Sequence, residues 1–163
     1  MLYWTKESDT NNPVTYIDRK GRWIMDNQHL PEAGDFWSFQ DFDGKMLYVR
    51  TPEGGDNYTF HGYKAKGLKH VAGKQVVGNP SLRNTGGVYI RTYTGAGCGL
   101  IVCDRKLKKE KWGSLPAPGE ISRLTKKVYV RRAESTAGGV VTRAYSLFNK
   151  KGVITTYEFS YPE

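Results

Sequence analysis

Long apolar runs are missing from this sequence. No stretch approaches the roughly 18 consecutive apolar residues that a membrane-spanning helix needs. The first residues, Met-Leu-Tyr-Trp-Thr-Lys, also lack the basic start and the apolar centre of a secretory signal. We therefore expect a cytoplasmic protein without a membrane span.

Cysteine and histidine are also scarce. Cys98 and Cys103 lie five positions apart in one expected strand, so their side chains face opposite sides and do not bridge if that strand is continuous. The three histidines, His29, His61 and His70, show neither the helical spacing of a metalloprotease nor the spacing of a structural zinc site. We expect free thiols and no metal site.

Enzyme motifs are equally sparse. The sequence has no nucleophile elbow, no phosphate-binding loop and no dinucleotide fingerprint. Carboxylates crowd the segment from Asp35 to Asp56, but spacing along the chain does not place two of them at catalytic separation. We expect no cofactor and no catalytic residues, so the sequence favours a binding protein over an enzyme.

Positive charge is abundant instead. The formal net charge of the 163 residues is +9, which favours an anionic partner, although a basic balance can also serve solubility alone. Aromatic residues make up 13% of the chain and provide the burial that disordered chains lack. The length predicts a single domain over residues 1–163.

Alternating apolar and polar residues predict strands along most of the chain. The clearest hairpin places Asp43-Gly44 between Phe36–Gln40 and Met46–Arg50, because Asp-Gly is a strong hairpin-turn pair. A second hairpin turns at Gly95–Gly97, and a meander fills the chain from Lys127 to Tyr161.

The segments between these hairpins contain many glycines, prolines and charges. We expect loops over Lys64–Gly73 and Asn79–Gly87, irregular chain over the proline-containing Gly113–Gly119, and one helical turn over Glu120–Thr125. In total, ten to twelve strands are expected, with no helix longer than two turns. The predicted fold is all-β, an antiparallel meander forming a single closed or nearly closed barrel, with a β-sandwich as the alternative.

Three of the expected strands resemble one another: Leu47–Thr51, Val88–Thr92 and Val128–Arg132. Their tyrosines, Tyr48, Tyr89 and Tyr129, recur at intervals of about forty residues. Each unit continues into a basic segment, and a matching segment lies in the first quarter of the chain, so four units of about forty residues are a reasonable description. These segments are Asp18–Gly21, Tyr63–Gly67, Asp104–Lys106 and Asn149–Gly152.

Tyrosine and arginine share one face of these strands because side chains alternate. Arginine supplies a planar fork of donors for a carboxylate or phosphate, and tyrosine adds a hydroxyl and an aromatic wall. If this face points into a barrel, an anionic amphipathic ligand would satisfy the arginines. The predicted ligand-binding residues are Tyr48, Arg50, Tyr89, Arg91, Tyr129, Arg131, Arg143 and Tyr145.

If the same face points outward, it predicts a different partner. Basic groups interleaved with aromatics on a sheet stack single-stranded bases and neutralise phosphates. A basic, β-rich nucleic-acid-binding protein is therefore the alternative, and an inhibitor or interaction module acting by shape is a third class. The cations expected to contribute are Lys64, Lys66, Lys69, Arg105, Lys106, Lys108, Lys109 and Lys111.

The segment Val140-Val141-Thr142-Arg143-Ala144-Tyr145 resembles the last strand of intracellular fatty-acid-binding proteins. More broadly, a hairpin-built chain of this length is similar to the calycin barrels, which include lipocalins and phycobilin lyases. The resemblance implies that Arg143 and Tyr145 line a cavity and bind the acid group of a lipid or tetrapyrrole. The chain departs from that family by lacking its early helix pair and by continuing for a further hairpin after this strand.

Overall fold

The computed structural model describes residues 3–4, 16–17, 23–25, 30–33 and 37–163. Within these residues the regular structure consists of antiparallel strands and two single-turn 3-10 helices, η2 (Pro31–Ala33) and η3 (Lys66–Leu68). The short strands β1 (Tyr3–Trp4), β2 (Tyr16–Ile17) and β3 (Trp23–Met25) form a three-stranded sheet. The all-β prediction is therefore confirmed for the described chain. The predicted basic segment Asp18–Gly21 lies outside the described residues.

The remaining strands form three four-stranded meanders, which we call sheets I, II and III. Sheet I contains β4 (Ser38–Phe42), β5 (Met46–Gly54), β6 (Asn57–Lys64) and β7 (Lys69–Val77). Sheet II contains β8 (Asn79–Asn84), β9 (Val88–Thr94), β10 (Gly97–Cys103) and β11 (Glu110–Ala117). Sheet III contains β12 (Glu120–Arg123), β13 (Tyr129–Ala137), β14 (Val140–Asn149) and β15 (Gly152–Pro162).

The Asp43-Gly44 hairpin forms as predicted, between β4 and β5. The Asp43 carboxylate accepts hydrogen bonds from the backbone amides of Lys45 at 2.9 Å and Met46 at 2.7 Å. Gly44 takes a positive φ of 86°, which glycine adopts without the steric cost that a side chain adds. The turn at Gly95–Gly97 and the final meander are confirmed as well.

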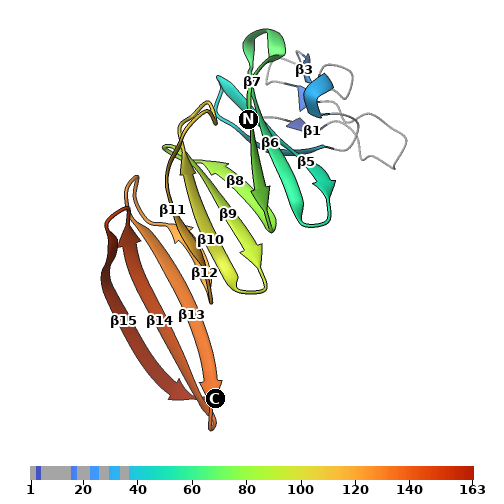
Figure 1. Cartoon of the computed structure of the whole chain (residues 1–163). Helices are drawn as coiled ribbons and strands as arrows, with labels where there is room; N and C mark the ends of the chain where they lie inside the picture. The colour runs from blue at the N-terminus through green and yellow to red at the C-terminus, as the bar shows by residue number, and fades with distance from the viewer. Residues whose placement is uncertain (1–2, 5–15, 18–22, 26–29, 34–36) are drawn as a thin grey trace.

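Sheets I, II and III follow one another along the chain and stack face to face (Figure 1). Between sheets I and II, Tyr48 and Phe60 pack against Leu82 and Ile90 in one buried cluster. Between sheets II and III, aromatic and aliphatic side chains form a second cluster, which includes Tyr89, Leu100, Tyr129 and Phe148. We call the face that a sheet turns toward the next one its leading face, and the opposite face its trailing face.

The expected barrel is wrong for the described chain, which shows no closed barrel. The face-to-face packing matches the sandwich alternative, repeated from sheet to sheet. The physical reason is that sheets I and II are apolar on both faces: Leu47 and Val49 pack on the trailing side of β5 while Tyr48 packs on the leading side. A strand buried on both faces suits an inner layer of a stack.

Glycines at the two connections turn the chain from one sheet into the next. Gly78 joins sheets I and II with a φ of 96°, and Gly119 joins sheets II and III with a φ of 98°. The two glycines hold equivalent places in successive units of the repeat. Because the strand after each glycine begins a new layer, the meander does not continue into one large sheet.

Several segments predicted as irregular are strands. Asn79–Asn84 forms β8, and β11 runs through Pro116 to Ala117. Pro116 is tolerated because β11 is an edge strand, where a missing amide donor leaves no ladder bond unmade. The predicted helical turn at Glu120–Thr125 is also wrong, because β12 pairs with β13 there.

The two cysteines are free and buried, as expected. Cys98 belongs to the cluster between sheets II and III, and Cys103 to the cluster between sheets I and II. They therefore lie on opposite faces of β10. The described residues form no helix long and apolar enough to cross a membrane.

Replacing Gly78 or Gly119 with alanine should destabilise the stack. A Cβ at Gly78 would lie 2.8 Å from the Tyr93 carbonyl oxygen, and one at Gly119 would press on the carbonyl of Arg132. The matched control is Gly138→Ala, because Gly138 also has a positive φ of 58° but has open space around it. Urea unfolding should show a loss of about 1 kcal/mol for the control and at least about 3 kcal/mol for either connection variant. Equal losses would contradict this explanation.

Candidate functional site

The predicted tyrosine and arginine residues of β5 and β9 lie between sheets, on the two leading faces. Tyr48 points into the cluster between sheets I and II, and Tyr89 into the cluster between sheets II and III. Arg50 donates to the Pro80 carbonyl at 2.7 Å, and Arg91 donates to the Ile121 carbonyl at 3.3 Å. Each arginine thus ties its sheet to the first strand of the next sheet.

These arginine contacts between sheets recur at a constant interval in residue number along the chain. The step from Arg50 to Arg91 equals the step between their acceptors, from Pro80 to Ile121. The same step leads from Arg91 to Arg132 on β13. The repeat is therefore one four-stranded sheet, about forty residues long as predicted from sequence.

The third tyrosine and arginine pair lies on the opposite face from the first two. The interval from Tyr89 to Tyr129, and from Arg91 to Arg131, is one residue shorter than the interval from Arg50 to Arg91. A shift of one residue moves a side chain to the other face of a strand. They point from sheet III back toward sheet II. The nearly equal tyrosine spacings thus conceal a change of face.

Arg131 is held by four acceptors in sheet II. It donates to the carbonyls of Cys98 at 2.7 Å and Ala117 at 2.6 Å, and more weakly to Ser114 and Leu115. Burial lowers the pKa of this guanidinium below its ordinary value, yet the group has no carboxylate partner among the described residues. Its charge is stabilised by backbone carbonyl dipoles, which suits a structural tie between sheets.

The last predicted pair, Arg143 and Tyr145, lies on β14 and faces away from sheet II. The partner on the neighbouring strand is Glu134, whose carboxylate is 2.5 Å from Arg143 Nε. Tyr145 stacks on Phe159 with ring centroids 5.9 Å apart. The structure therefore separates this pair from the other predicted site residues, and it does not bring the set of eight together around one cavity.

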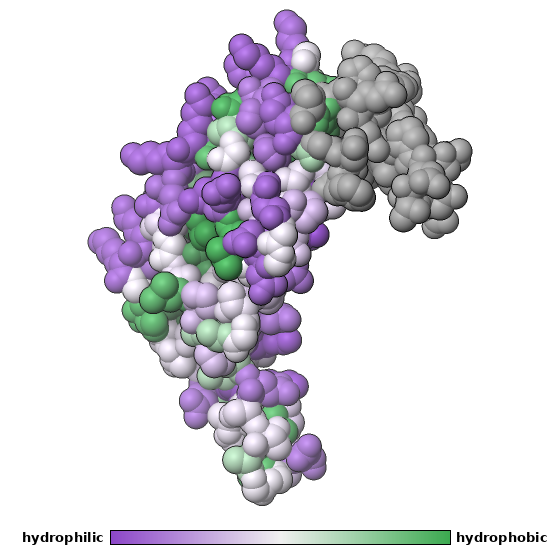
Figure 2. All heavy atoms as spheres, turned by 45° about the vertical axis from the view of Figure 1, so that its right-hand side comes forward, coloured by the Kyte–Doolittle hydropathy of each residue, from purple (hydrophilic) through white to green (hydrophobic). Residues whose placement is uncertain are grey.

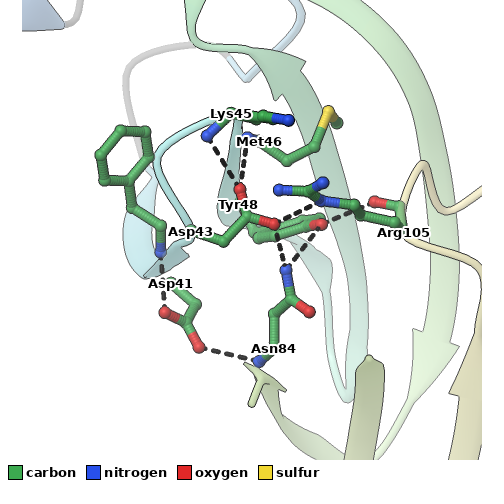
Figure 3. Close-up of polar contacts among 8 residues, drawn as sticks. Asp41, Asp43, Lys45, Met46, Tyr48, Asn84 and Arg105 are labelled. Carbon is green, nitrogen blue, oxygen red and sulfur yellow. Dashed lines mark hydrogen bonds and ion pairs between the residues drawn. The ribbon is translucent and has the colours of Figure 1, made fainter. Parts of the chain in front are cut away.

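Polar contacts join sheet II to the first turn of sheet I, between β4 and β5, and to the adjoining Tyr48 (Figure 3). Arg105 donates to the Asp43 carboxylate at 2.5 Å, and Asn84 donates to the same carboxylate. The Tyr48 hydroxyl donates to the Arg105 carbonyl at 2.6 Å. Burial alone would raise the pKa of the Asp43 carboxyl, but Arg105 and the amides of Met46 and Lys45 outweigh burial and lower it.

A matching contact joins sheet II to sheet III. Arg123, at the end of β12, donates to the carbonyls of Gly86 and Gly87 at 2.9 Å and also bonds the Thr85 carbonyl. These carbonyls belong to the turn between β8 and β9. The first and third turns of all three sheets therefore lie along one side of the stack, which we call the rim.

The rim carries all eight of the predicted nucleic-acid-binding cations. In a meander the first and third turns lie on the same side and the second turn on the other, so alternate turns share one edge. The rim turns contribute Lys45, Lys64, Lys66, Lys69, Arg105, Lys106, Lys108, Lys109, Lys111, Lys126, Lys127, Lys150 and Lys151.

The opposite side of the stack is different in charge. The second turns, 54–57, 94–97 and 137–140, and the connections at 78 and 118–120 contain acidic residues and glycines but no lysine or arginine. On the rim, the carboxylates of Asp43 and Asp104 are already engaged, by Arg105 and by the Lys109 amide. The positive charge is therefore segregated onto one side, where it raises the local potential.

A groove opens at this rim between sheets II and III. Its main part has a volume of about 570 Å³ and is lined by cations from three turns, including Lys111, Lys126, Lys150 and Arg123, with no carboxylate among its lining residues. A neighbouring hollow of about 330 Å³ shares Trp112 with it. This combination of ammonium groups and an indole fits an anionic group attached to an aromatic or apolar body.

Trp112 is held in place by aromatic neighbours. Its ring meets Tyr129 at 5.6 Å and Phe148 at 6.4 Å between centroids, both edge to face. Trp112 and the lysines at 126, 127, 150 and 151 were not predicted from the sequence to form one site. Their common signal is position, because they come from β11 and the rim turns of sheet III.

Within the described chain, no group of three or more histidine, cysteine, aspartate or glutamate residues is placed to hold a metal ion. Burial raises the pKa of the Cys103 thiol to about 11, so this thiol stays protonated near neutral pH. His61 and His70 adjoin in sheet I, with 3.1 Å between Nδ1 and Nε2. His61 Nε2 is 3.3 Å from the Thr51 hydroxyl.

Comparison with models of known protein families gives no match, and comparison with curated protein sequences gives no significant match.

Removing the Arg131 side chain's charge should destabilise the stack. Arg131→Met leaves the carbonyls of Cys98 and Ala117 without this donor, and unsatisfied polar groups between sheets cost about 2 kcal/mol or more. The control Lys127→Met removes an exposed charge and should change the free energy of unfolding by no more than about 0.5 kcal/mol. Denaturant unfolding tests this, and equal stabilities for the two variants would refute the structural role.

The His61 imidazole should make stability depend on pH. Burial, and then the neighbouring His70, lowers the pKa of His61 below 6.5. As the pH falls below 6.5, His61 is protonated in the unfolded chain before it is protonated in the folded chain. The free energy of unfolding is therefore unaffected by His61 above that pH and decreases as the pH falls from 6.5 toward the lower pKa of the folded state. The urea midpoint should fall between pH 7.5 and pH 5, and His61→Gln should reduce that fall. An unchanged fall in the variant would contradict this origin.

Proposed function

We propose that this chain is a nucleic-acid-binding protein that holds a phosphate backbone along its basic rim. One observation carries the proposal: lysines and arginines from the turns of all three sheets gather on one side, while the opposite turns carry none. A line of cations along successive layers fits a linear polyanion better than a single small anion. Its attraction comes from neutralised phosphates and released counterions.

The rim is suited to backbone contacts more than to base recognition. Its cations are mostly lysines on turns, and long flexible ammonium side chains follow a phosphate chain without a fixed fork geometry. The arginines that could read bases or phosphates in pairs, Arg50, Arg91 and Arg131, are already bonded to carbonyls between sheets. We therefore expect binding with little sequence preference and strong salt dependence.

The test compares two double variants with the same change in net charge. Lys108→Gln with Lys109→Gln removes two charges from the rim, and Ala96→Glu with Ala137→Glu adds two negative charges on the opposite turns. Binding of a labelled 20-nucleotide single strand and of the matching duplex is measured by anisotropy over a salt series. The rim variant should bind at least tenfold more weakly and show a salt slope smaller by about 1.5.

Two results would overturn the proposal. One is no binding of either probe by the wild-type chain at low salt. The other is an equal loss of affinity in the rim variant and the opposite-side control, because then net charge alone, and not the rim, would set binding.

A small anionic amphipathic ligand is the second candidate, and the groove between sheets II and III favours it. A carboxylate-bearing lipid or tetrapyrrole, the ligand class that the calycin resemblance implies, would place its acid group among Lys126 and Lys150 and its body against Trp112. Native mass spectrometry and tryptophan fluorescence with oleate and with biliverdin test this. Saturable binding that weakens in Lys126→Gln with Lys150→Gln supports it, and no response to either probe contradicts it.

A further inference from the structure

Sheet III leaves its leading face uncovered, unlike sheets I and II. The leading faces of sheets I and II are each buried by the sheet that follows. The trailing face of sheet I is also covered, because Leu30 and Ala33 pack on Leu47, Val49 and Tyr63. Among the three four-stranded sheets, the face of sheet III turned away from sheet II is therefore the one without a covering layer in the described chain. We call it the outer face.

The outer face has the chemical character of a covered face. Tyr145 stacks on Phe159, and Phe159 stacks on Tyr161 with centroids 6.4 Å apart. Tyr157 and Phe159 nevertheless remain 61% and 50% exposed. Much of the lower end of the molecule, formed by sheet III, is pale or green in Figure 2. Strand register places on this face Glu120, Ser122, Val130, Arg132, Glu134, Thr136, Val141, Arg143, Tyr145, Leu147, Thr155, Tyr157, Phe159 and Tyr161.

Each leading face has an arginine over a tyrosine ring, a contact that also occurs on the trailing face of sheet III, between Arg123 and Tyr129. Arg50 lies 5.0 Å from the ring centroid of Tyr58 in sheet I, and Arg91 lies 5.9 Å from that of Tyr93 in sheet II. On the outer face, Arg143 lies 5.2 Å from the ring centroid of Tyr161. The outer face thus shares this type of contact with the two buried leading faces, although its arginine lies on the third strand of the sheet instead of the second.

Arg132 is the donor that this face leaves unused. It continues the constant step that leads from Arg50 to Arg91, and both of those arginines donate to a carbonyl in the next sheet. Within the described chain the Arg132 side chain makes no hydrogen bond or ion pair. A β-sheet packed on this face could supply a backbone carbonyl for Arg132, as the adjoining sheets do for Arg50 and Arg91.

We propose that a second copy of this chain covers the outer face with its own outer face. Head-to-tail stacking onto sheet I is blocked because Leu30 and Ala33 already occupy its trailing face. Two copies must then use the same face, which gives a closed two-fold dimer instead of a filament. The face carries both signs of charge, Arg132 and Arg143 with Glu120 and Glu134, so it can be complementary to itself.

The basic rim of sheet III lies away from the aromatic part of the outer face. Tyr161 pairs with Val141 beside the glycine turn at 138–139, whereas Lys150 and Lys151 lie at the other end of β14 and β15. Dimerisation through the outer face therefore leaves the rims of both copies open. The inference does not depend on nucleic-acid binding by the rim.

Analytical ultracentrifugation of the wild-type chain and of two variants tests the dimer. Phe159→Glu places a charge among the stacked aromatic rings of the outer face and should raise the dimer dissociation constant at least tenfold. The matched control is Leu115→Glu, because Leu115 on β11 is 86% exposed but lies off this face, and it should leave the constant unchanged. Circular dichroism checks folding. If Phe159→Glu unfolds, Tyr157→Lys, at a more exposed position, replaces it.

Three outcomes would overturn the proposal. A wild-type chain that stays monomeric up to about 100 µM excludes a useful dimer. A dimer that resists Phe159→Glu and Tyr157→Lys uses another surface. Protection of Tyr157 and Phe159 by a single-stranded oligonucleotide, in a chain that remains monomeric, would assign the outer face to base stacking instead.

Discussion

Each four-stranded sheet in this protein depends on a neighbouring layer to cover its apolar faces. A single repeat unit of this kind cannot bury its own apolar faces, and stacking on a neighbour buries them. Sheets I and II carry buried side chains on both faces of their second strands, so neither can stand at the surface of a sandwich or in the wall of a barrel with one wet face. Stacking follows from this requirement.

Arginine gives the stack its register. Apolar packing between two sheets tolerates sliding, whereas a guanidinium aimed at particular carbonyls does not. Arg50, Arg91 and Arg131 each bond acceptors in an adjoining sheet, and Arg123 holds the preceding sheet's first turn. Since these arginines are engaged in the stack, the cations left for a partner are chiefly the rim lysines.

Much of the strand pattern could be predicted from sequence, because alternation and turn chemistry are local. Asp43-Gly44 and the glycines at 95 and 97 mark their hairpins directly. A barrel could not be distinguished from a stack of sheets by sequence. The difference depends on single connecting residues such as Gly78, where a positive φ turns the chain out of one sheet and into the next layer. Strands β8 and β12 were missed because their sequences, with Pro80 in β8 and a charge at each end of β12, have weak strand propensity and form by pairing with β9 and β13.

The predicted site residues were identified by a repeat that is real, but their environment depends on tertiary packing. The interval between Tyr89 and Tyr129 is one residue short of the repeat, which places Tyr129 on the other face of its strand although the spacing looks regular. No feature of the sequence around Arg50 shows that a backbone carbonyl of the next sheet will accept its hydrogen bond. The rim was partly foreseen from the basic segments after Tyr63 and Cys103. Its extension to Lys126, Lys127, Lys150 and Lys151 required knowing which turns share a side.

The central claim is that arginines hold the sheets together while rim lysines meet the partner. Nuclear magnetic resonance of the arginine Nε–Hε groups and backbone amides during titration with a 20-nucleotide single strand tests both halves at once. We predict shifts at the rim turns 104–109, 124–128 and 149–152, with the Nε–Hε signals of Arg50, Arg91 and Arg131 unchanged. Large shifts of those three arginine signals, with unchanged rim amides, would contradict it.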